Sequence, residues 1–141
     1  MPANVRPEIL YCERDERQLY DQLKEEEIFK NMDLKHVFMM AFAKGVQAKK
    51  RNPLKNRASG GLIREAYLDD RERALIRAVA IAEEGKLGVL LDEKRVYQIA
   101  EEYASGGIRL LKNEVCSGDF GSYSKRLGEA LKTEAERGPT K

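Results

Sequence analysis

The chain has 141 residues, 42% of them hydrophobic and 35% charged, and its net charge is only +2. This size suits one globular domain with a core of its own, and no apolar run approaches the roughly 20 residues that a membrane-spanning helix needs. Acidic residues begin at position 8 and no hydrophobic signal segment precedes them, so we expect a cytoplasmic protein.

The first two segments with helical periodicity are predicted at 15–27 and 34–47. Asp15 opens an Asp-x-x-Gln pattern that is close to a capping box, and Leu19 and Leu23 follow four residues apart. Asp33 is a suitable N-cap for the second helix. That helix is apolar on most of its circumference, which predicts a place at the centre of a helical bundle.

A basic segment follows and overlaps the second helix. Residues 34–64 contain eight Lys and Arg and no acidic residue, whereas residues 8–33 contain nine acidic residues and four basic ones. The densest part, 49–57, contains Pro53, which disfavours helix in the preceding residue. We therefore predict an exposed basic loop of the kind that meets phosphate.

The later elements are also predicted as helices. A short one is expected over 62–67, and a longer one over 70–84, with an Asp-x-x-Glu capping box at Asp69 and a C-terminal stop at Gly85. Residues 89–91 are apolar but too few to form a sheet without partners.

Asp92 is expected to cap a helix with a clear amphipathic stripe, which Gly106-Gly107 would interrupt before helical spacing resumes over 108–115. A last helix is expected over 123–131. The sequence thus predicts an all-α, compact single-domain bundle of about six or seven helices. Residues 1–12 would form an N-terminal extension, 13–133 the helical domain and 134–141 a frayed C-terminal tail.

No catalytic or metal-binding constellation is visible in the sequence. His36 is the only histidine, and Cys12 and Cys116 are too far apart for the usual zinc spacing, so we expect two thiols, no metal and no cofactor. A disulfide between them stays open but would be unusual in a reducing cytosol. Among the paired carboxylates, Glu101-Glu102 is the pair that would matter for a metal-dependent nuclease, if it converged with another carboxylate.

The basic segment is the strongest functional signal. Its candidate nucleic-acid-binding residues are Lys44, Lys49, Lys50, Arg51, Asn52, Lys55, Arg57 and Arg64. Lysine and arginine gain affinity for DNA by releasing condensed counterions, and asparagine can add hydrogen bonds. Because no aromatic residue interleaves the loop, contact with a duplex backbone is favoured over stacking on a single strand. Two alternatives stay open, an acidic partner protein or second copy, and a solvated loop balanced by the acidic first helix.

Two stretches resemble a known family. They are the helix from His36 to Gly45 followed by Arg51-Asn52-Pro53-Leu54, and the segment Ile99-Ala100-Glu101-Glu102-Tyr103-Ala104-Ser105-Gly106-Gly107-Ile108. Both are similar to small accessory proteins encoded beside Dnd-type DNA sulfur-modification (phosphorothioation) genes. The resemblance covers about 6–131 and implies a biological context without any catalytic residue.

From the residues and the resemblance together, we expect a non-enzymatic accessory protein of a DNA-modification or defence system that contacts duplex DNA phosphates. Other proteins of that system are further expected partners, and no membrane is expected. The alternative is a protein–protein interaction adaptor that binds through exposed tyrosine and methionine side chains. A metal-dependent nuclease is a third hypothesis.

Overall fold

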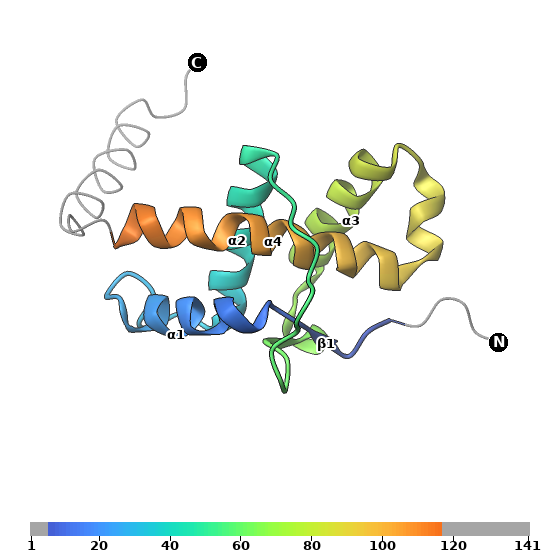
Figure 1. The fold of residues 1–141 in the computed structure, drawn as a ribbon. Helices are drawn as coiled ribbons and strands as arrows, with labels where there is room; N and C mark the ends of the chain where they lie inside the picture. The colour runs from blue at the N-terminus through green and yellow to red at the C-terminus, as the bar shows by residue number, and fades with distance from the viewer. Residues whose placement is uncertain (1–5, 117–141) are drawn as a thin grey trace, which may run out of the picture.

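The computed structural model describes residues 6–116, which form a helical structure with one small sheet (Figure 1). Its α-helices are α1 (Arg17–Glu25), α2 (Leu34–Ala48), α3 (Asp70–Glu84) and α4 (Glu93–Val115). Three short 3-10 helices accompany them, η1 (Arg14–Glu16), η2 (Glu65–Tyr67) and η3 (Leu87–Leu91). The described residues therefore hold four α-helices, so the prediction of six or seven helices is not matched. The helix expected over 123–131 lies outside the described residues.

The prediction of an all-helical chain is wrong in one place. Strands β1 (Ile9–Leu10) and β2 (Ile63–Arg64) pair antiparallel, with Ile9 opposite Arg64 and Leu10 opposite Ile63. The helix expected over 62–67 is in fact β2 followed by the 3-10 turn η2. Leu10 is fully buried, so strand β1 contributes to the core.

Helix α3 follows its sequence signals closely. The Asp69 side chain accepts a hydrogen bond from the Glu72 amide, and the Glu72 side chain accepts one from the Asp69 amide, both at 2.8 Å. Gly85 ends the helix in the left-handed conformation, at a φ of 73°. The capping box and the C-terminal glycine together define the bounds of this helix.

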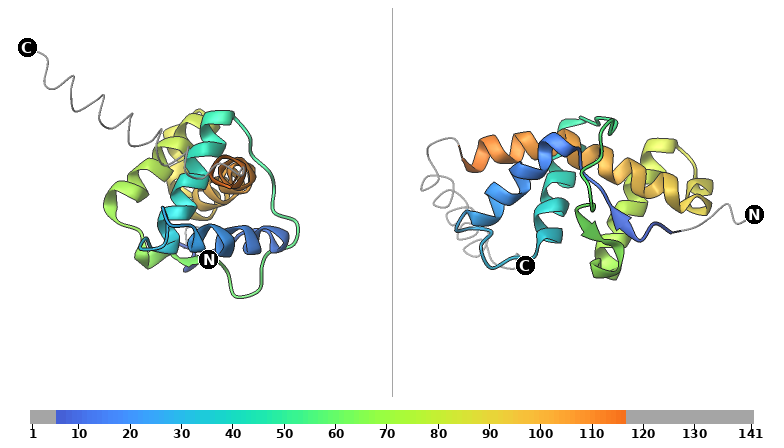
Figure 2. Two further views of the ribbon diagram at one scale, coloured as in Figure 1. Left: turned by 90° about the vertical axis from the view of Figure 1, so that its left-hand side faces the viewer. Right: turned by 60° about the horizontal axis from the view of Figure 1, so that its bottom comes forward.

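Helix α4, rather than α2, is the most enclosed element. Every residue from Ile99 to Ile108 is buried, and in the end-on view of α4 the other α-helices lie on some sides of it while the loop after α2 passes along another side (Figure 2). None of the helices within residues 6–116 is long and apolar enough to cross a membrane.

Gly106 and Gly107 do not interrupt α4, contrary to the prediction. A Cβ atom on Gly107 would lie 1.8 Å from the Ala41 carbonyl oxygen of α2, and one on Gly106 would lie 1.9 Å from the Lys50 carbonyl oxygen. Glycine inside a helix costs about 1 kcal/mol relative to alanine. Here it allows the backbones of α2 and of the following loop to approach α4 closely, and tertiary packing outweighs the weak helix propensity.

Candidate nucleic-acid interface

The basic loop begins where α2 ends. Lys49 adopts the left-handed conformation, with a φ of 55°, and the Lys50 amide donates to the Gly45 carbonyl oxygen at 2.9 Å. This helix-ending motif reverses the chain direction, so that the loop runs across α4 (Figure 1). The Asn52 amide then donates to the Glu102 carbonyl oxygen of α4 at 3.0 Å, which fixes the crossing point.

Arg51 ties the loop to two helices. Its guanidinium lies 2.9 Å from the Glu83 carboxylate of α3 and 3.1 Å from the Glu102 carboxylate of α4. It also lies 6.0 Å from the centre of the Tyr103 ring, whose hydroxyl donates to Glu83 at 2.5 Å. The Arg51 side chain is only 27% exposed, and its charge is balanced by carboxylates of the protein itself.

Lys44, on α2, is also used internally, because it forms an ion pair with Glu114 of α4. Arg51 and Lys44 were both predicted to meet phosphate, and the structure places both beside carboxylates. These carboxylates come from α3 and α4. The acidic first helix, which the solvated-loop alternative invoked, does not supply them.

The remaining lysines of the loop are available to a ligand. Lys49, Lys50 and Lys55 are exposed, and their ammonium groups form no ion pair within residues 6–116. Arg64 is likewise exposed, on β2, whereas Asn52, within the loop, is half-buried.

Glu13 holds the second half of the loop in place. Its carboxylate accepts hydrogen bonds from the backbone amides of Lys55, at 3.0 Å, and Asn56, at 2.5 Å. The Ala58 amide donates to the Cys12 carbonyl oxygen at 2.9 Å. The loop therefore has a defined backbone, and its lysines project from a fixed support.

Arg57 lies against a tyrosine that the sequence did not associate with the loop. Its guanidinium is 5.1 Å from the centre of the Tyr11 ring, and the Tyr11 amide donates to the Glu101 carboxylate at 2.7 Å. Glu101 is 6% exposed, and burial raises its pKa to about 7, although the Tyr11 amide and the Arg57 charge act in the opposite direction. Tyr11 was missed because it lies 46 positions before Arg57 in the sequence, and only the pairing of the N-terminal segment with the loop reveals the contact.

Glu101 and Glu102 do not converge on a shared site. Glu101 meets Tyr11 and Glu102 meets Arg51. Within the described part of the chain there is no group of three or more His, Cys, Asp or Glu side chains that could hold a metal ion. The convergence that the nuclease hypothesis required is therefore not found there. Cys12 and Cys116 are both free thiols.

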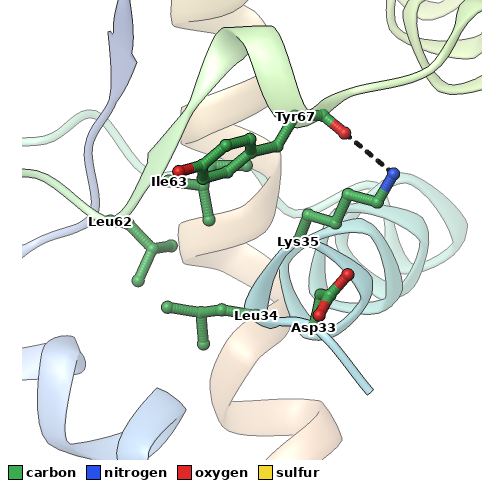
Figure 3. Close-up of a pocket in the computed structure, with 6 residues that line it drawn as sticks. All are labelled: Asp33, Leu34, Lys35, Leu62, Ile63 and Tyr67. Atoms are coloured by element: carbon green, nitrogen blue, oxygen red, sulfur yellow. Dashed lines mark hydrogen bonds between the residues drawn. The ribbon is translucent and has the colours of Figure 1, made fainter.

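A second surface feature is apolar. A groove of about 520 Å³ lies between the start of α2 and the segment from β2 to η2 (Figure 3). Leu34, Leu62, Ile63 and Tyr67 line it, and Tyr67 is 62% exposed. Lys35 donates from its ammonium to the Tyr67 carbonyl oxygen at 2.8 Å, which holds the rim of the groove.

Comparison with known proteins gives one match. The family model described as DNA sulphur modification system-associated protein 4 matches residues 12–141. No curated protein and no solved structure matches the chain.

Proposed function

The chain belongs to the DNA sulphur modification system-associated protein 4 family, and on this premise we propose that it is a non-enzymatic accessory protein that contacts duplex DNA phosphates through its basic loop. The observation that carries the proposal is the division of charge within the loop. Lys49, Lys50 and Lys55 are exposed and form no ion pair within residues 6–116, whereas Arg51 is neutralised by carboxylates.

The fixed backbone of the loop favours binding. A loop that must be ordered on binding loses affinity, and Glu13 together with the Asn52 amide orders this one in advance. Each lysine that neutralises a phosphate releases counterions, which adds about −0.9 to the slope of log affinity against log salt. Three lysines would therefore account for a slope of about −3.

The test compares two triple variants on one labelled, fully paired duplex across a salt series, measured by fluorescence anisotropy. The loop variant is Lys49→Gln, Lys50→Gln, Lys55→Gln. We expect weaker binding at low salt and a slope that is flatter by about three. Arg51 is left intact because its removal would disturb the fold and confuse the result.

The matched control is Lys30→Gln, Arg71→Gln, Lys86→Gln, which removes the same charge from exposed side chains outside the loop. It should keep most of the slope. If both variants lose affinity equally, binding depends on net charge and the loop is not the contact. If the wild-type protein does not bind the duplex at low salt, the DNA proposal is wrong.

The apolar groove supports a second candidate function, that of an adaptor for another protein of the same system. An exposed tyrosine beside an apolar groove is a common anchor in protein interfaces. Co-purification with the other proteins of a DNA sulphur modification system would test this, with Tyr67→Ala expected to reduce capture. Leu91→Ala is the control, because Leu91 is 75% exposed and lies outside the groove.

A further inference from the structure

A pocket of about 280 Å³ lies between the N-terminal extended segment and the first half of α4, and Arg57 of the loop also lines it. Lys94, Gln98 and Glu101 line it from one face of α4, because they are spaced at i, i+4 and i+7. Ile9 and Tyr11 line it from the opposite side, since alternate residues of an extended segment share a face. The volume of this pocket is close to the lower limit of the volumes of small-molecule binding sites.

The polar groups of the pocket are placed at different depths. Glu101 is almost fully buried, whereas Arg57, Lys94 and Gln98 are exposed. The Oε2 atom of Glu101 accepts the Tyr11 amide, and its Oε1 atom receives no hydrogen bond within residues 6–116. A ligand would therefore meet an open carboxylate oxygen inside the pocket and two positive charges near its mouth.

This arrangement offers partners for the edge of a base, for its face and for a phosphate, which are all present in a nucleotide. A carboxylate accepts hydrogen bonds from the amino group of a base, as glutamate does from cytosine N4. Arginine and lysine bind phosphate, and a guanidinium plane or tyrosine ring stacks on a base. A base that is stacked within a duplex cannot enter a pocket to reach a carboxylate that is only 6% exposed, whereas an unpaired base can leave the stack.

We propose that this pocket holds a single unpaired nucleotide with an amino-bearing base, its base edge on Glu101 and its phosphate between Arg57 and Lys94. Adenine, cytosine and guanine carry such an amino group, and thymine does not. The inference rests on the proposed function in one respect, namely that DNA supplies the nucleotide. It adds a preference for distorted or unpaired sites over regular duplex.

The test uses three labelled duplexes that are otherwise identical: one fully paired, one with an extra unpaired cytosine and one with an extra unpaired thymine. We expect the cytosine duplex to bind about tenfold more tightly than the thymine duplex at about pH 8, where Glu101 is mostly ionised. Glu101→Gln should bring this ratio close to one. Glu27→Gln, which changes an exposed carboxylate outside the pocket, should leave the ratio unchanged.

Equal binding of the cytosine and thymine duplexes by the wild-type protein would overturn the inference, as would an unchanged ratio in Glu101→Gln. The proposed function would be judged separately, from the loop variant on the fully paired duplex. If no duplex binds, the protein is titrated with free deoxycytidine monophosphate, and binding is monitored through the NMR signal of the Tyr11 amide. A saturable shift that disappears in Glu101→Gln would support the pocket with a free nucleotide, and no shift would overturn it.

Discussion

Replacing Glu101 by glutamine should stabilise the protein at alkaline pH and have little effect at acidic pH. Glu101 is 6% exposed, and burial raises its pKa from 4.5 to about 7. The folded protein therefore holds this proton more tightly than the unfolded chain does. Glutamine has the same shape, stays neutral at every pH and can still accept the Tyr11 amide through its carbonyl oxygen.

The size and the pH window of the effect follow from this shift. Below about pH 4.5 the carboxyl is protonated in both states, and its ionisation does not affect the free energy of unfolding. Between about 4.5 and about 7 the unfolded chain loses the proton first, so the wild-type protein becomes less stable as the pH rises. At about 1.4 kcal/mol per pKa unit, the loss reaches about 3 kcal/mol above pH 7.

Urea unfolding of the wild-type protein and of Glu101→Gln at a series of pH values would measure the difference between their free energies of unfolding. All other titratable groups contribute equally to the two proteins, so the difference reports on Glu101 alone. We expect Glu101→Gln to gain about 3 kcal/mol over the wild-type protein at about pH 8 and almost nothing at about pH 4.5. Glu27→Gln serves as the exposed control. A difference that does not vary with pH would refute the reasoning, as would a less stable variant at about pH 8, since Arg57 would then compensate the buried charge.

Two further predictions concern the packing of α4. Gly107→Ala should cost about 3 kcal/mol of unfolding free energy, because the new Cβ would lie 1.8 Å from a carbonyl oxygen of α2. Gly88→Ala, with open space around it, should change stability by less than about 0.5 kcal/mol, and equal effects in urea unfolding would contradict this account. Arg51→Met should cost about 2 kcal/mol, because it leaves the 8% exposed Glu102 carboxylate unpaired. The double variant Arg51→Met, Glu102→Gln should recover most of this loss, and additive effects in the double-mutant cycle would show that the two side chains do not interact.

Local signals predicted the helices well where they coincided with the packing. The capping box at Asp69 and the stop at Gly85 bound α3, and α2 starts and ends within one residue of its predicted limits. Propensity failed at Gly106-Gly107, where the close approach of a distant backbone outweighs the cost of glycine. It failed again over 62–67, because the strand there depends on pairing with residues 9–10. Neither contact is local in sequence.

The same limit applies to the candidate site. The sequence located the basic loop, but it could not show that Arg51 and Lys44 face carboxylates of α3 and α4. It also could not show that Tyr11 lies against Arg57 of the loop or that Lys94 lines the same pocket as Arg57, because Tyr11 and Lys94 come from other segments. A run of charges in a sequence indicates where positive residues gather, and only the fold determines which of them are already neutralised.

At position 51 an arginine suits the structural role better than a lysine would. Arg51 contacts two carboxylates and a tyrosine ring at once, which suits a planar guanidinium with several donors. The ammonium group of lysine is a compact charge on a flexible stem and suits a phosphate that approaches from solvent. A conservative Arg51→Lys change should therefore destabilise the fold and leave the net charge unaltered. If it instead preserved stability in urea unfolding, Arg51 would not be structural, and its place among the DNA-contacting residues would have to be restored.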